Sequence, residues 1–434
     1  MCSRPGGGPP VSPGDPTVVV EVTDTLGAGY TTGIQRVVRE VVAGLDREPG
    51  IEVVPVLTPG VGAPMRRLTP EEAERLARHP SGGRAGRRAD DFGRLSPLAR
   101  RVGDLPAVVR ARVALRRWRS RRRPPLPLHP ELVHEPAAGS VFLDLEGSWY
   151  DPTPRSELLP ALRRAGVRTM VFVHDVMPVT HPEWFTPMHR SVFGSWLDAQ
   201  LRHSERFLTN SEHTAATLVE VAARAGVALE PVVVPLGGDL PVDEPTPVEL
   251  PAGMDRFLLV VGTLEPRKNQ AVVLDAFDRL RGEHPELGLV LVGKEGWMVD
   301  DLVDRVRRHP ASGRRLLWLG GLDDAELDWL YREAFLCVAP SIDEGLGVPV
   351  REALARGRPT IASTGGAQPE AAAGAAELFD PQDVAGLTSL VARHLDDPAH
   401  HAERTRVAGE FRPPTWADAV ATVVEQVRAL VPGT

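Results

Sequence analysis

Residues 257–269 read FLLVVGTLEPRKN, and this stretch decides the fold that the chain is expected to adopt. Five apolar residues have the pattern of a short buried strand, and Gly262 follows where the strand would turn into a helix. A strand, a glycine turn and a helix form the unit from which parallel α/β sheets are built. Backbone N–H groups in such a turn face the carboxyl edge of the sheet, where they bind anions.

Two cations follow this turn. Arg267 offers a forked donor and Lys268 a compact point charge, a combination that suits the two phosphates of a diphosphate. We therefore predict that the turn binds a diphosphate through Gly262, Thr263 and the two cations. The alternative is an ordinary strand-to-helix turn with surface cations.

Lysine is rare in this chain, since all but two of its 50 basic residues are arginines. The two lysines, Lys268 and Lys294, are therefore candidates for positions where arginine cannot substitute. Lys294 also follows a predicted strand. We expect it either to contact the same ligand or to pair with an acidic residue such as Glu295.

A second pattern lies in residues 341–357, which read SIDEGLGVPVREALARG. Gly345 and Gly347 permit a tight loop and a close approach of a ligand, and Pro349 suits the first turn of a helix. The free N–H groups around Gly347 and Val348 then form an anion site at the start of that helix.

Two carboxylates, Glu344 and Glu352, flank this second anion site. Because carboxylates repel phosphate, we expect them to accept hydrogen bonds from sugar or ribose hydroxyls. For Glu352, placed in the first turn of the helix, an ordinary helix-terminal charge is the alternative.

Short apolar runs alternate with longer amphipathic stretches along most of the chain, which predicts an α/β fold of two Rossmann-like, doubly wound parallel-sheet domains facing a cleft. The predicted strands are Val18–Val22, Val53–Leu57, Val141–Leu145, Thr169–Val173, Arg206–Leu208 and Pro231–Val234 in the first half, and Phe257–Val261, Leu289–Val292, Leu316–Leu319, Leu336–Val338, Pro359–Ala362 and Glu377–Phe379 in the second.

These strands and the Pro-rich stretches between them suggest five segments. They are a disordered tail at 1–16, an acceptor-side domain at 17–240 with a basic insertion at about 65–136, a linker at 241–254, a nucleotide-binding domain at 255–412, and a helix at 413–434 that crosses back.

Composition excludes several classes of protein. Cys2 and Cys337 have no paired spacing, so a disulfide framework and a cysteine zinc site are not expected. The N-terminal residues lack the apolar core of a signal peptide, and no stretch of about 18 apolar residues could span a bilayer. We therefore expect a cytoplasmic protein.

The basic insertion concentrates positive charge, with 18 arginines and six acidic residues between Arg66 and Arg123. Within it, Pro106–Arg123 has the pattern of a basic amphipathic helix that contains Trp118. Such a helix suits peripheral contact with an anionic membrane at the inner face of the plasma membrane. The alternative is a solvated or disordered Arg-rich segment. Nucleic-acid binding is not expected, because interleaved aromatic residues are lacking.

These motifs together resemble the nucleotide-sugar-dependent retaining glycosyltransferases of family 4, which have the GT-B fold. The resemblance rests on residues 262–269, on the pair Glu344 and Glu352, and on residues 357–370. In the first half, residues 32–40, 173–185 and 209–214 resemble the mannosyl-type members that build bacterial surface polysaccharides. Leu346 departs from the family, which usually has an aromatic residue between the two loop glycines.

The resemblance implies a role for each motif. Arg267 and Lys268 would stabilise the leaving diphosphate, Glu344 would hold the transferred sugar, and Glu352 the ribose. His174, at the end of a predicted strand, would lie near the donor sugar. The implied catalytic residues are His174, Glu344, Arg267 and Lys268. The implied donor-binding residues are Gly33, Gly262, Thr263, Arg267, Lys268, Lys294, Leu322, Glu344, Gly345, Leu346, Gly347, Val348 and Glu352.

No metal or cofactor is expected, because no Asp-x-Asp motif follows a predicted strand. The acidic pairs Asp300-Asp301 and Asp323-Asp324 are expected to cap helices. The implied activity is transfer of a hexose, mannose-like and GDP- or UDP-linked, to a saccharide or lipid-linked saccharide. Alternatives are transfer to a secondary metabolite, a same-fold epimerase or phosphorylase, a nucleotide-binding scaffold, and an RNA-binding protein that uses the insertion.

Overall fold

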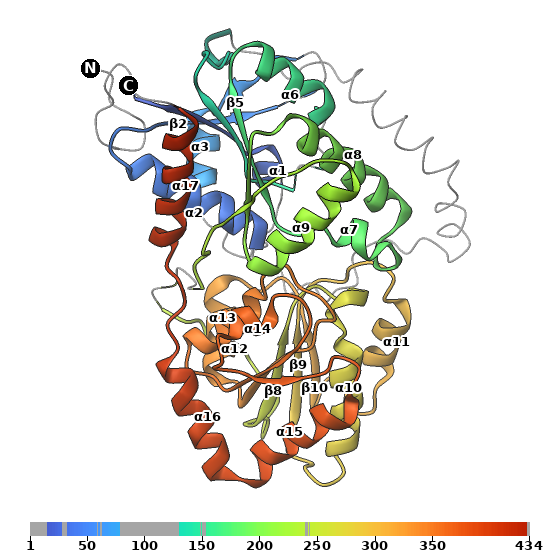
Figure 1. The fold of residues 1–434 in the computed structure, drawn as a ribbon. Helices are drawn as coiled ribbons and strands as arrows, with labels where there is room; N and C mark the ends of the chain where they lie inside the picture. The colour runs from blue at the N-terminus through green and yellow to red at the C-terminus, as the bar shows by residue number, and fades with distance from the viewer. Residues whose placement is uncertain are drawn as a thin grey trace. The chain divides into compact units, whose positions relative to one another are not determined.

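The chain folds into two compact α/β units in a computed structural model (Figure 1). The structure describes residues 15–27, 33–58, 60, 63–78, 130–147, 149, 153–238, 242 and 244–431. Of these residues, those up to 237 and from 414 onward form the N-terminal unit, and those within 238–413 form the C-terminal unit. The predicted helix at Pro106–Arg123 lies outside the described residues.

The N-terminal unit contains a seven-stranded sheet in its described part, in the order β3-β2-β1-β4-β5-β6-β7. All neighbouring strands are parallel except β2 and β3, which are antiparallel. The strands are β1 Thr17–Glu21, β2 Glu52–Leu57, β3 Arg66–Arg67, β4 Val141–Asp144, β5 Arg168–Val173, β6 Arg206–Thr209 and β7 Val232–Val233. The helices are α1 Thr23–Gly27, α2 Gly33–Arg47, α3 Pro70–Ala77, α6 Arg155–Arg164, α7 Met177–Thr180, α8 Pro187–His203, α9 Glu212–Arg224 and α17 Trp416–Leu430.

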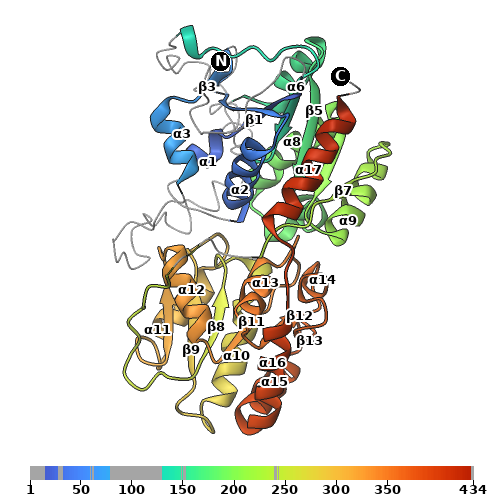
Figure 2. The same ribbon diagram turned by 90° about the vertical axis from the view of Figure 1, so that its left-hand side faces the viewer.

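The C-terminal unit contains a six-stranded parallel sheet in the order β10-β9-β8-β11-β12-β13 (Figure 2). Numbered within the unit, this order is 3-2-1-4-5-6, that of the Rossmann fold. The strands are β8 Phe257–Val261, β9 Gly288–Val292, β10 Leu316–Leu319, β11 Leu336–Ala339, β12 Thr360–Ser363 and β13 Glu377–Phe379. The helices are α10 Gln270–Leu280, α11 Asp300–Arg308, α12 Asp324–Glu333, α13 Val348–Ala355, α14 Gln368–Ala372, α15 Val384–Asp396 and α16 Pro398–Glu410.

The predicted α/β class with two Rossmann-like sheets is confirmed, and every predicted strand is present to within a residue or two at either end. Continuous apolar runs such as Val18–Val20 and Leu289–Leu291 are buried, because helices cover both faces of each parallel sheet. The sequence prediction missed β3, which lies inside the basic insertion together with α3.

The C-terminal helix α17 belongs to the N-terminal unit, as predicted, and packs against α2 (Figure 2). Its buried face consists of Ala419, Val420, Val423, Val424, Val427 and Leu430. Residues of the predicted linker pack instead against the C-terminal unit, where Val248 and Leu250 contact a core cluster around Tyr331.

No helix in the described part of the chain is both long and apolar enough to cross a membrane.

Candidate functional site

The turn after β8 packs backbone against backbone with the turn after β9. Gly262 donates its N–H to Val292 O at 2.8 Å, and both Gly262 and Gly293 have positive φ, at 149° and 151°. A Cβ atom on Gly293 would lie 2.1 Å from Gly262 O, so a side chain cannot fit there. This contact positions the backbone of Thr263 and the residues that follow.

Arg267 and Lys268 lie in a 3-10 turn, Pro266–Lys268, that two hydrogen bonds of Asn269 hold in place. Asn269 adopts a left-handed backbone conformation, and its Nδ2 donates to Pro340 O at 3.2 Å and to Pro381 O at 2.7 Å. The N–H of Ile342 donates to Arg267 O at 2.7 Å. The turn after β8 is thereby tied to the loop after β11.

The loop after β11 leads directly into α13. Gly347 is the N-cap of α13, with φ of 81°, and it has no side chain to cap the first N–H groups. The turn after β12 packs against this loop. A Cβ on Gly366 would lie 2.4 Å from Glu344 N, and the N–H of Ala367 donates to Glu344 O at 2.8 Å. The N-terminus of α13 thus lacks a side-chain cap, and its binding of an anion stays a prediction.

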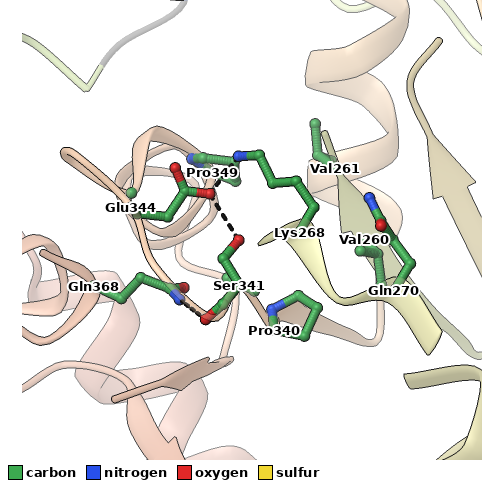
Figure 3. Close-up of a pocket in the computed structure, with 11 residues that line it drawn as sticks. Val260, Val261, Lys268, Gln270, Pro340, Ser341, Glu344, Pro349 and Gln368 are labelled. Carbon is green, nitrogen blue, oxygen red and sulfur yellow. Dashed lines mark hydrogen bonds and ion pairs between the residues drawn. The ribbon is translucent and has the colours of Figure 1, made fainter. Parts of the chain in front are cut away.

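Both predicted cations meet at the carboxylate of Glu344. Figure 3 shows one of them, Lys268, beside that carboxylate. Arg267 Nη1 lies 2.8 Å from Oε2, while Lys268 Nζ bonds to Oε1. Ser341 Oγ donates to the same Oε1 at 2.7 Å. Burial alone would raise the pKa of Glu344, but Arg267 and Lys268 outweigh burial and lower that pKa to about 2. Glu344 is thus ionised and neutralises cations that an anionic ligand could also bind.

A pocket opens beside this ion-pair cluster (Figure 3). It is lined by Val260, Val261, Lys268, Gln270, Ala339, Pro340, Ser341, Glu344, Gly347, Pro349 and Gln368. Of the predicted site residues, the structure brings Lys268, Glu344 and Gly347 to this pocket.

The sequence analysis assigned no role to two glutamines of this pocket. Gln270 and Gln368 are buried, and their Nε2 groups donate to Thr263 O and Ser341 O, each at 3.0 Å. Their Oε1 atoms have no hydrogen-bond partner among the described residues. Each glutamine is the first residue of a helix that follows a strand, which is the sequence signal that could have revealed them.

The position predicted for Glu352 was wrong. Because α13 begins at Val348, Glu352 lies in its second turn, and its carboxylate accepts a hydrogen bond from Tyr331 Oη at 2.8 Å. Burial raises the pKa of Tyr331, and the Glu352 charge raises it further, so the phenol keeps its proton. This hydrogen bond fixes the orientation of the Glu352 side chain.

The remaining predicted donor-binding residues of this unit differ in exposure. Lys294 is exposed, whereas Leu346 is buried and Leu322 packs against a core cluster. Glu295, the suggested partner of Lys294, instead lies 3.6 Å from Arg307.

The expectation that both acidic pairs cap helices was correct for one of them. Asp323 is the N-cap of α12 and forms a capping box with Glu326. The N-cap of α11 is Val299, so Asp300 and Asp301 lie in the first turn of that helix instead.

His174 and Gly33 lie in the N-terminal unit. His174 directly follows β5, and its Nε2 lies 2.8 Å from Leu145 O, so Nε2 carries the proton. Burial lowers the pKa of His174 to about 4, and the ring is neutral at pH 7. Gly33 is the exposed first residue of α2.

Comparisons with known proteins place the C-terminal unit in a sequence family and relate the fold of the chain to solved structures. Residues 243–410 match the family described as Glycosyl transferases group 1. The serotype-specific mannosyltransferase WbdA of Escherichia coli is 32% identical over 218 residues, which are 47% of this chain and 27% of that protein. Glycogen synthase of Mycobacterium tuberculosis is 33% identical over 261 residues, 58% of this chain and 61% of that protein.

Among solved structures, Anabaena HepE in complex with UDP is similar, with a TM-score of 0.57 at 14% identity, covering 95% of this chain and 100% of that chain. This likeness shows the fold alone, and the chain spans only about a quarter of the length of the E. coli relative. Residues 243–410 are therefore a glycosyl transferases group 1 domain, within a chain that has the GT-B fold and resembles bacterial mannosyltransferases.

Proposed function

We propose that the chain is a retaining glycosyltransferase that moves a hexose from a nucleotide-diphosphate sugar to a saccharide or lipid-linked saccharide. Sequence similarity to an E. coli mannosyltransferase supports a mannose-like donor sugar. The donor would bind in the C-terminal unit, which carries the matched domain.

One observation carries this proposal. Arg267 and Lys268, 76 or more residues from Glu344 in sequence, converge on that carboxylate beside the N-terminus of α13. Lys268 lines the pocket together with Gly347, the N-cap of α13, and Arg267 lies next to it through Glu344. Two cations and a helix N-terminus in this arrangement are suited to the two phosphates of a nucleoside diphosphate.

In the proposed mechanism, negative charge grows on the diphosphate as the bond to the sugar breaks. Arg267, Lys268 and the N–H groups of α13 stabilise that charge, which lowers the energy of the transition state more than that of the bound donor. Once the phosphates occupy the cations, the Glu344 carboxylate is released to accept hydrogen bonds from hydroxyls of the transferred sugar. Glu352, held by Tyr331, accepts those of the ribose.

Two residues of the N-terminal unit are part of the same proposal. From the family resemblance, Gly33 is proposed to approach the donor phosphates and His174 to act near the donor sugar. Neutral His174 has its Nε2–H bonded to Leu145 O, which leaves Nδ1 as a hydrogen-bond acceptor.

Release of nucleoside diphosphate from a panel of nucleotide sugars tests the proposal. The panel contains GDP-mannose and UDP-, ADP- and dTDP-glucose. Glucose is included because similarity to the mycobacterial glycogen synthase makes it the second candidate for the donor sugar. We expect one donor to be consumed and Lys268→Ala to lower the rate about 100-fold. Arg279→Ala, on an exposed position of α10, removes a cation outside the pocket and should leave the rate unchanged.

Binding is measured separately by thermal shift with GDP, UDP, ADP and dTDP. One nucleoside diphosphate should raise the melting temperature, and Lys268→Ala should remove most of that rise. A chain that responds to none of the four and consumes no donor would contradict the proposed site and the proposed activity together.

The proposed acceptor is lipid-linked if the basic segment predicted at 106–123 contacts anionic lipid. Pelleting with liposomes that contain phosphatidylglycerol tests this contact. The intact chain should pellet and a chain without 106–123 should stay in the supernatant.

A further inference from the structure

Three side chains from three elements of the C-terminal unit meet at one point outside the pocket described above. They are Glu377 of β13, His394 of α15 and His400 of α16, elements that pack together at one edge of the sheet (Figure 2). Glu377 Oε2 lies 2.7 Å from His394 Nε2 and 3.2 Å from His400 Nε2. One ligand atom from each residue lies within 4.8 Å of the other two.

The local fold fixes each of these side chains. His394 has a fully buried side chain, and His400 lies in the first turn of α16, where Asp397 Oδ1 accepts its N–H at 3.0 Å. Glu377 begins β13 and pairs with Ile361 of β12. The side chains of His400 and Glu377 are 10% and 15% exposed, so an ion and a water molecule could reach the cluster from solvent.

We propose that Glu377, His394 and His400 bind a divalent transition-metal ion, for which Zn²⁺ suits the donor set best. Two imidazole nitrogens and one carboxylate oxygen are common Zn²⁺ ligands, whereas Mg²⁺ and Ca²⁺ prefer oxygen atoms alone. Around an ion in tetrahedral geometry the ligand atoms lie about 3.3 Å apart. The two distances from Glu377, 2.7 and 3.2 Å, are slightly shorter than this value, and the two histidine nitrogens lie within 4.8 Å of each other. Small side-chain movements would therefore complete the site, with water as the fourth ligand.

A further histidine supports the proposed ligand His394. His401 Nδ1 lies 3.1 Å from His394 Nδ1, the ring nitrogen that does not face Glu377. The His401 ring is itself held by stacking on Phe335, with centroids 4.1 Å apart. A metal-bound histidine usually donates its outer N–H to such a partner, which fixes the ring orientation and the tautomer.

One neighbouring charge opposes the metal. Arg404 Nε lies 3.7 Å from Glu377 Oε2, and its Nη2 is bonded to Ala375 O at 2.6 Å. Because this cation repels a metal ion, we expect weaker affinity than that of a fully coordinated structural zinc site. By holding β13, α15 and α16 together, the bound metal would stabilise the C-terminal unit. This proposal does not rest on the proposed sugar transfer.

Cobalt titration of the untagged full chain, after removal of metals with EDTA, tests the site. We expect one Co²⁺ per chain, with the visible absorption bands of tetrahedral coordination, displaced by Zn²⁺ and not by Mg²⁺. Glu377→Gln and His400→Asn should each weaken Co²⁺ binding at least tenfold, as measured by calorimetry.

Two control variants should keep the affinity of the unaltered chain. His309→Asn alters a similar pair, in which His309 Nε2 lies 2.7 Å from Asp278, but among the described residues no second histidine joins that pair. Lys268→Ala alters the pocket described above. Absence of bound Co²⁺ in the unaltered chain, or unchanged binding in both Glu377→Gln and His400→Asn, would overturn the proposal.

Discussion

The ionisation of Glu344 links the stability of the C-terminal unit to pH. The folded pKa of about 2 lies below the ordinary value of 4.5, so the folded state loses the proton more readily than the unfolded state. The resulting stabilisation is fully present above about pH 4.5 and is lost as the pH falls toward 2. The shift corresponds to about 3 kcal/mol in the free energy of unfolding.

Glu344→Gln should therefore lower the free energy of unfolding by about 3 kcal/mol at pH 7 and weaken its pH dependence below 4.5. Urea unfolding at pH 7 and at pH 3 measures both effects. Glu333→Gln is the control, because Glu333 is exposed on α12 and should behave as the unaltered chain. If Glu344→Gln lowered the free energy of unfolding equally at pH 7 and at pH 3, the result would argue against the ion-pair cluster.

His174 offers a second prediction at the scale of one residue. Burial disfavours its charged form, so NMR titration should show the ring protonating near pH 4 instead of near the ordinary value of 6.5. Since the folded pKa is depressed, the stabilisation is present above pH 6.5 and is lost as the pH falls toward 4. A His174→Asn spectrum assigns the signal. A midpoint at pH 6 or above would show that the ring is solvated.

The turns after β8 and β9 act as one element, because their backbones touch at Gly262 and Gly293. Gly293→Ala should destabilise the C-terminal unit by about 3 kcal/mol, since the new Cβ atom would meet a carbonyl oxygen that cannot move without shifting the turn after β8. Gly282→Ala is the matched control, because a Cβ there has no neighbour within 4 Å. Urea unfolding midpoints compare the two, and similar midpoints would contradict the close contact.

The elements were predictable from sequence to different degrees. Strands such as Phe257–Val261 form apolar runs between turn residues, so pattern alone locates them. β3 consists of Arg66 and Arg67, and it forms through antiparallel pairing with β2 and a bridge from Arg66 to Val133, contacts that no local sequence pattern indicates. The start of α13 at Gly347 and Val348 was expected correctly, but Glu352 is the fifth residue from Val348 and therefore lies in the second turn instead of the first.

The residues that line the pocket were predicted in part. Lys268, Glu344 and Gly347 follow the carboxyl ends of two adjacent strands, so the sheet topology brings them together as expected. The ion pair between Lys268 and Glu344 was not predictable, because both side chains were expected to contact a ligand and not each other. Without a ligand, burial forces opposite charges to satisfy each other.

At the scale of the whole molecule, the C-terminal unit has the Rossmann strand order, and the N-terminal unit has the same order with an antiparallel β3 and an added β7. The chain returns to its first unit through α17. α17 completes the N-terminal unit by packing on α2, where Gly44 faces Val420 and Arg428 lies 3.2 Å from Glu48. The buried face of α17 is thus part of the first unit's core.

This packing predicts a compensating pair of substitutions. A Cβ atom at Gly44 would lie 2.2 Å from Val420 Cγ2, so Gly44→Ala should lower the free energy of unfolding by about 1–3 kcal/mol. Val420→Ala removes the clashing methyl groups, and the double variant should be more stable than the sum of the single effects predicts. Urea unfolding followed by tryptophan fluorescence measures all four chains. Strictly additive effects would mean that α17 does not pack on α2 at this position in solution.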